Sequence, residues 1–211
     1  MSLTGIFLIF FLVVHVGVNA CIWANDDGKM FNLAAHFMGS TIVIRIVEVG
    51  LFAGLLLHII QGLILEFQNR SKRQTGYAVP MRNKGSKWYS RSMGLLGTLL
   101  LFFLIVHLRQ FWGPSRFSDL PTTVYDGKEI PNQFGEIINV FQSPVVVIFY
   151  VLACVSLMYH LLHGFQSAFR TLGVPNGKYI SLIKAVGFGF AVIVSLAFAM
   201  MPISVYLGWV S

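Results

Sequence analysis

The sequence has few charged residues, and this shortage limits the class of protein. Only 11% of its 211 residues are charged and 56% are hydrophobic, whereas a soluble domain carries about a quarter charged residues. The charge is missing mainly from runs of twenty or more residues, long enough to cross a hydrocarbon core of about 30 Å. The predicted fold class is an all-α integral membrane protein.

Several sequence motifs are also missing. The two cysteines, Cys21 and Cys154, form neither a disulfide framework nor a zinc motif. No CxxCH haem-attachment motif occurs, so any haem is expected to be non-covalent. No nucleophile–base–acid set or phosphate loop is present, and we predict no catalytic residue. The first apolar run lacks a basic leader and exceeds the usual length of a signal-peptide core, so we expect it to remain as a helix.

Five apolar segments have the length of transmembrane helices. Turn-forming residues separate them, including Pro114, Pro121 and Pro131 between the third and fourth. We expect one transmembrane domain over residues 1–211. The predicted spans are about 3–24, 41–67, 91–113, 141–170 and 179–208.

The basic residues lie mostly on one side of these spans, although the net charge is +7. The loop 68–91 is strongly basic, and the link between spans four and five adds Arg170, Lys178 and Lys184. By the positive-inside rule this side is cytoplasmic. The N-terminus is then cytoplasmic and the C-terminus outside. The charge orients the chain and does not indicate nucleic-acid binding.

Histidines occur on four consecutive spans. His15, His58 and His107 lie on spans one to three, and His160 and His163 lie on span four. Ionisable residues within a bilayer are costly and usually mark a functional path. At about 1.5 Å per residue, His58 and His163 fall in a layer near the cytoplasm, and His15 and His107 in a deeper one. Two pairs of imidazoles at two depths suit two bis-histidine haems inside the bundle formed by the first four helices.

Other polar residues near these layers are candidate partners of haem propionates. They are Arg45, Arg109, Arg170 and Gln166. For Arg109 and Arg170, the alternative is that the side chains extend to the membrane interface without touching haem.

Four stretches together resemble a known family. They are "LTGIFLIFFLVVHVGVN" (3–19), "LLLHIIQGL" (55–63), "LIVHLRQFW" (104–112) and "HLLHGFQSAFRTLG" (160–173). Their order and spacing are similar to those of the cytochrome b558-type membrane subunit of succinate dehydrogenase/fumarate reductase, in its single-chain, five-helix, di-haem form.

The resemblance implies a membrane anchor for a flavoprotein subunit and an iron–sulfur subunit on the cytoplasmic face. Two haems b would pass electrons between the iron–sulfur clusters and a quinone, commonly menaquinone in this family. The implied distal ligands are His15 and His107, and the proximal ligands are His58 and His163, which a glycine follows directly. His160 would then touch the haem edge or a propionate; the alternative is the reverse, with His160 as the ligand and His163 at the edge.

Two further features bear on quinone chemistry. Some relatives carry an acid two positions before the proximal histidine on span four, where this chain has Leu161, so a proton relay there is not expected. His36 and Glu48 lie near the outer ends of the first two spans and are quinone-site candidates. Alternatively, Glu48 forms a structural ion pair with Arg45.

Two other functions fit parts of the pattern. One is the cytochrome b subunit of another membrane oxidoreductase, of the hydrogenase or formate dehydrogenase type, since the same histidine layers would serve it. The other is a haem-free transporter with a histidine proton relay. A relay gives no reason for pairs at two depths or for a fifth span without histidine.

Overall fold

The structure is a computed structural model that describes residues 1–72, 88–174 and 179–210. Five helical segments in it are long and apolar enough to cross a membrane, which confirms the predicted fold class. They run over Ser2–Ala24, Ile42–Ser71, Met93–Phe117, Pro144–Thr171 and Ile180–Tyr206. Most of the predicted basic loop 68–91, together with Lys178, lies outside the described residues.

The spans contain most of the regular elements. The first comprises α1 (Ser2–Ala20) and a short 3₁₀ turn (Cys21–Ala24), and the second is α3 (Ile42–Ser71). The short α4 (Trp88–Arg91) precedes the third span, which joins α5 (Met93–His107), a π-helical turn (Leu108–Trp112) and α6 (Gly113–Phe117). The fourth is α8 (Pro144–Thr171) and the fifth is α9 (Ile180–Tyr206).

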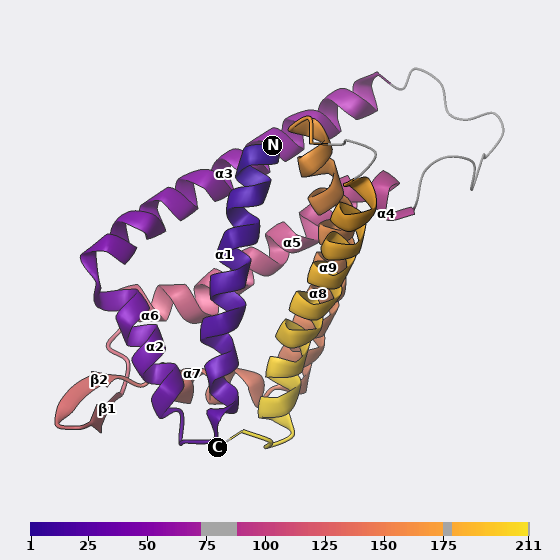
Figure 1. Ribbon diagram of the computed structural model, residues 1–211. Helices are drawn as coiled ribbons and strands as arrows, with labels where there is room; N and C mark the ends of the chain where they lie inside the picture. Colours follow the sequence, from indigo (N-terminus) through magenta and orange to yellow (C-terminus); the bar gives the residue numbers. More distant parts are fainter. Residues whose placement is uncertain (73–87, 175–178, 211) are drawn as a thin grey trace.

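Sequence reasoning missed a small cap at the end of the bundle where the C-terminus lies (Figure 1). The cap consists of α2 (Lys29–Ser40), the antiparallel strands β1 (Thr122–Tyr125) and β2 (Lys128–Pro131), and α7 (Gln133–Phe141). We had expected only loops there. The alternating "TTVY" and "KEIP" segments around Asp126 and Gly127 are a typical hairpin signal, but they are only four residues long.

Asn32 holds the cap together. It is 1% exposed; its amide donates to the Tyr125 hydroxyl (3.2 Å) and to Asn132 Oδ1 (3.1 Å), and its oxygen accepts the Phe134 N–H (2.8 Å). Gly28 precedes α2 with φ +74°, and a Cβ there would lie 2.2 Å from the Phe134 ring, so only glycine fits.

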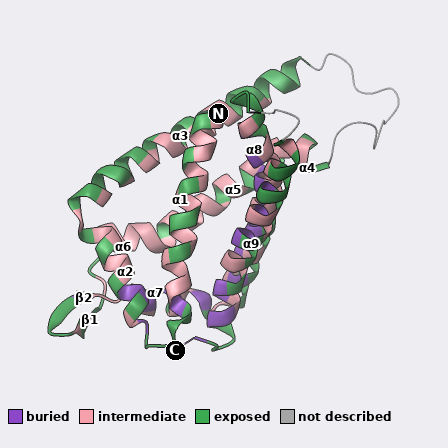
Figure 2. Cartoon of the chain, viewed as in Figure 1, coloured by how far each residue is buried: buried purple, intermediate pink, exposed green. Residues whose placement is uncertain are grey.

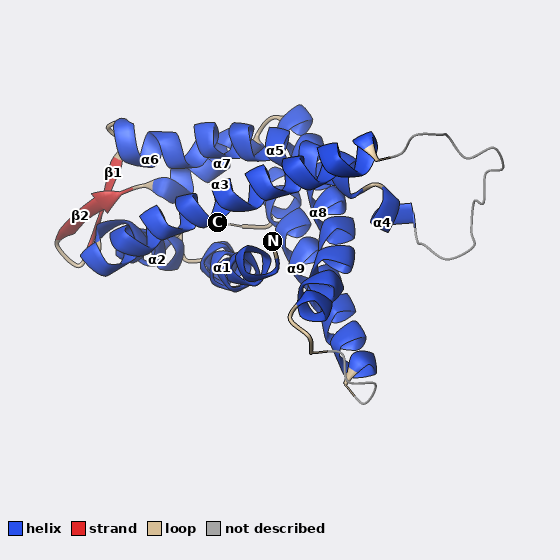
Figure 3. Ribbon diagram, turned by 90° about the horizontal axis from the view of Figure 1, so that it is seen from above, coloured by secondary structure: helices blue, strands red, loops and turns tan. Residues whose placement is uncertain are grey.

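Packing is uneven across the bundle. The helices α8 and α9 each contain eight buried residues and lie side by side in both ribbon views (Figures 1 and 3). By contrast, α1 and α3 contain none, and their ribbons are coloured exposed or intermediate in Figure 2. The α8–α9 pair is therefore the rigid side of the bundle. The helices that carry His15 and His58 contribute little to a protein core.

Candidate functional site

Two pairs of histidine rings face each other inside the bundle. The first pair joins α1 to the end of α5: the ring centroids of His15 and His107 are 5.8 Å apart, with an interplanar angle of 88°. This is the distal pair predicted from depth. Each ring stacks on a phenylalanine one turn earlier in its own helix, Phe11 at 5.1 Å and Phe103 at 5.3 Å, as side chains four residues apart share a helix face.

The second pair joins α3 to α8 and differs from the prediction. The ring of His58 faces His160, with centroids 6.3 Å apart and an interplanar angle of 70°. The family resemblance implies His163 opposite His58, because the family's histidine on this span is followed directly by glycine. The rotation of α8 is fixed instead by the buried side chains Leu161 and Phe165, and the Phe165 ring packs against Gly187 and Phe190 of α9. That rotation brings His160 to face His58, whereas His163 lies about 60° further round the helix.

Glycines of two neighbouring helices border the second pair. A Cβ at Gly5 of α1 would lie 3.7 Å from Cε1 of His58, and one at Gly97 of α5 would lie 4.0 Å from Cε1 of His160. His15 and His107 each follow the corresponding glycine by ten residues. At 1.5 Å per residue, both helices therefore separate the two pairs by about 15 Å. This spacing agrees with the two predicted layers.

Three of the four paired rings have a polar partner at Nδ1. Thr4 Oγ1 lies 3.3 Å from Nδ1 of His58, Asn19 Nδ2 lies 3.4 Å from that of His15, and the Tyr150 hydroxyl lies 3.5 Å from that of His107. A metal-bound histidine typically donates its second ring N–H to a nearby acceptor, which directs Nε2 to the metal. The hydroxyl oxygens of Thr4 and Tyr150 can accept in this way. The amide nitrogen of Asn19 can only donate, and it also donates to the His15 carbonyl at 2.8 Å. Nδ1 of His160 is buried without a hydrogen-bond partner among the described residues.

The residues fit haem iron better than a protein-ligated metal. Among the described residues, no cluster of three or more His, Cys, Asp or Glu side chains could hold a metal ion. Haem iron needs only two axial protein ligands. With metal–nitrogen bonds of about 2 Å, two imidazoles on one metal have ring centres roughly 6 Å apart. The observed 5.8 and 6.3 Å lie on either side of that spacing.

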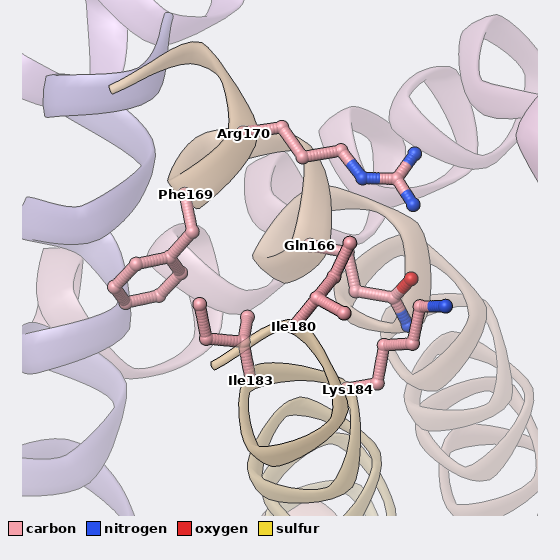
Figure 4. Close-up of a pocket in the computed structure, with 6 residues that line it drawn as sticks. All are labelled: Gln166, Phe169, Arg170, Ile180, Ile183 and Lys184. Atoms are coloured by element: carbon pink, nitrogen blue, oxygen red, sulfur yellow. The ribbon is translucent and has the colours of Figure 1, made fainter. Parts of the chain in front are cut away.

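The predicted propionate partners lie at the margins of this arrangement. Arg45 and Arg109 are exposed. Gln166 and Arg170 line a small pocket between α8 and the start of α9 (Figure 4). Its other lining residues are Phe169, Ile180, Ile183 and Lys184. None of these contacts tests an interaction with propionates, so the four assignments stay predictions.

Glu48 forms a different ion pair from the one considered. Its carboxylate accepts from Arg116 Nη2 at 2.8 Å and Nε at 3.1 Å, and from Trp112 Nε1 at 2.6 Å. Arg116 also donates to the Gly39 carbonyl at 3.4 Å. The group joins the second and third spans to the end of α2, and we call these three side chains, Glu48, Trp112 and Arg116, the outer clamp. The expected alternative, a pair between Glu48 and Arg45, is replaced by this one.

His36 lies on α2 in the cap, outside the spans. It borders an open pocket of about 570 Å³ between α2 and the hairpin. The other lining residues are Leu33, Tyr125, Asp126, Lys128, Glu129 and Ile130. The two quinone candidates therefore differ in setting. His36 borders a pocket, whereas the Glu48 carboxylate already accepts hydrogen bonds from Trp112 and Arg116.

Sequence reasoning missed the residues that support the rings. Asn19 follows His15 by four residues and was detectable, because such a pair shares one helix face. The glycines ten residues before His15 and His107 formed a second unused signal. Thr4 and Tyr150 are 54 and 43 residues from the histidines they approach, and no local pattern indicates those contacts.

Comparison with known proteins agrees with the resemblance found in the sequence. No protein-family model and no solved structure matches the chain. Among curated proteins, it is 28% identical over 185 residues to the succinate dehydrogenase cytochrome b558 subunit of Bacillus subtilis (strain 168). The match covers 85% of this chain and 82% of the relative. The chain is thus a five-span, all-α membrane protein that is similar over most of its length to a cytochrome b558 subunit of succinate dehydrogenase, as its histidine-bearing segments predicted.

Proposed function

We propose that this chain is the membrane anchor and di-haem cytochrome b subunit of a succinate:quinone oxidoreductase. The observation that carries the proposal is the pairing of four histidines, from four helices, at two depths and at spacings compatible with iron. The similarity to a succinate dehydrogenase cytochrome b558 subunit supports it. It favours this function over a hydrogenase or formate dehydrogenase cytochrome b and over a haem-free proton relay.

The proposed axial ligands are His15 with His107 and His58 with His160. When bound, haem b supplies reversible one-electron transfer. The histidines would hold the iron, Thr4, Asn19 and Tyr150 would orient their rings, and the apolar helices would exclude water. His163 is not an axial ligand in this proposal, and its partly exposed ring is free to meet the haem edge.

The partners would be a flavoprotein and an iron–sulfur subunit on the cytoplasmic face, at the end of the bundle where the N-terminus lies (Figure 1). The cap and the C-terminus would then be outside, in a bacterial inner membrane. The two histidine pairs that would hold the haems are about 15 Å apart along α1 and α5.

The quinone, menaquinone in our proposal, would react at the outer end of the bundle, where the cap lies. Of the two candidates we retain His36, because its pocket also contains the hydrogen-bond donors Tyr125 and Lys128, which suit quinone carbonyls. Glu48 is a poor proton acceptor because Arg116 and Trp112 already occupy both carboxylate oxygens. We assign it to the outer clamp.

The test is haem quantification on the purified complex by pyridine haemochrome and reduced-minus-oxidised spectra. We expect two haems b in the wild type, one in the His160→Ala variant and two in His163→Ala. One haem in His163→Ala and two in His160→Ala would overturn the ligand assignment alone. A folded wild-type chain without haem would overturn the proposed function.

A further inference from the structure

The two histidine pairs differ in the side chains around them, and the distal pair, His15 and His107, has a buried tyrosine beside it. Tyr150 of α8 is 5% exposed. Its ring packs on that of Phe103 at 5.0 Å and on those of Phe141 and Phe111 at 4.9 and 6.3 Å. This aromatic cluster fixes the ring and leaves its hydroxyl at one defined position inside the bundle.

The hydroxyl has two neighbours with different roles. Its O–H donates to Oε1 of Gln110 at 2.6 Å, and its oxygen lies 3.5 Å from Nδ1 of His107. A tyrosine hydroxyl has one proton to donate, and Tyr150 donates it in the hydrogen bond to Gln110. The lone pairs of the hydroxyl oxygen therefore remain available to His107. The hydroxyl is therefore set to accept the Nδ1–H of His107.

The backbone helps to place all three groups. His107 ends α5, and Gln110 lies in the π-helical turn Leu108–Trp112 that follows directly. Such turns are rare and often occur at functional sites. Here the turn follows the histidine, and its Gln110 side chain reaches the hydroxyl of a residue on α8. A phenylalanine at position 150 would fill the same space, so packing alone does not explain a buried hydroxyl with two polar neighbours.

We propose that Tyr150, held by Gln110, is a positioning residue that sets the reduction potential of the distal haem through His107. The inference rests on the proposed function and deepens it. An acceptor at Nδ1–H makes the imidazole a stronger electron donor to the iron. A stronger donor favours the ferric over the ferrous state, because second-shell hydrogen bonding is one of the protein's controls on haem potential. Tyr150 therefore lowers the potential of the distal haem.

The experiment is an optical redox titration of the purified complex, comparing wild type with Tyr150→Phe. We expect two haems b in both proteins. We also expect the reduction equilibrium constant of one haem to rise roughly tenfold, by analogy with the smallest typical effect of second-shell partners on metal affinity or activity. This factor is about 59 mV for a one-electron couple. The haem that is missing from His107→Ala identifies the distal one. The proximal haem should keep its potential.

Two further variants separate tuning from packing. Gln110→Leu removes the group that orients the hydroxyl and leaves the Tyr150 ring in place, so we expect a smaller upward shift of the same haem. Tyr206→Phe, an exposed tyrosine on α9, should shift neither potential.

The outcomes distinguish the inference from the proposed function. Two haems with unchanged potentials in both Tyr150→Phe and Gln110→Leu would overturn the inference and leave the function standing. A downward shift, or an equal shift of both haems, would also overturn it. A wild-type complex without haem b would instead overturn the function.

Discussion

The outer clamp gives the sharpest prediction about stability. Glu48 and Arg116 have side chains only 18% and 16% exposed, and two hydrogen bonds join them. A third, from Trp112, completes the coordination of the carboxylate. Removing one partner of a largely buried ion pair typically costs about 3–5 kcal/mol, because the other charge is left uncompensated. We expect about 3 kcal/mol for Glu48→Gln, at the low end because glutamine still accepts one bond.

The same reasoning predicts strong non-additivity. In the double variant Glu48→Gln/Arg116→Gln neither charge remains, so the loss should be close to that of one single variant. The coupling energy is then about 3 kcal/mol, the upper end for residues that share one network. The corresponding thermal shift for each single variant is about 6–12 °C for a domain of this size, measured by circular dichroism in detergent.

A matched control lies in the same helix. Glu66 and Arg70 form an ion pair at 2.6 Å, but Arg70 is 73% exposed, so the pair should couple by only about 0.3–0.5 kcal/mol. If the Glu48–Arg116 cycle gives a coupling no larger than the Glu66–Arg70 cycle, the clamp does not join the second and third spans, and the reasoning is wrong.

Two other predictions follow from the packing. Gly97→Leu should abolish the proximal haem and spare the distal one, because even a Cβ at this position lies 4.0 Å from His160 and a leucine side chain extends further. The controls are Gly97→Ala and Gly189→Leu, and a Cβ at position 189 has no neighbour within 4 Å. Both controls should keep two haems in a pyridine haemochrome assay. Asn32→Leu should destabilise the cap by about 1–3 kcal/mol, since it leaves the Phe134 N–H without its acceptor. Faster proteolysis within residues 25–35 and 120–135 would report it, and an unchanged cleavage rate would contradict it.

The sequence determined the class of protein and most of the candidate site. Five spans followed from apolar length, because a backbone in lipid must satisfy its hydrogen bonds within each helix. The pairing of His15 with His107 followed from depth, because the rise per residue is fixed. The family resemblance followed from motifs spread over residues 3–173.

Only the tertiary structure decided which of two neighbouring histidines faces His58. Depth along a helix can be counted from the sequence, but rotation about its axis depends on what the other faces pack against, and Leu161 and Phe165 turn His160 inward. The same holds for the partner of Glu48. Arg45 is close to Glu48 in sequence, yet the carboxylate binds Arg116, which lies 68 residues further along the chain. The third span, with its π-helical turn, places Arg116 beside Glu48. Local spacing fixes which residues share a face of one helix, and only packing fixes which faces of different helices meet.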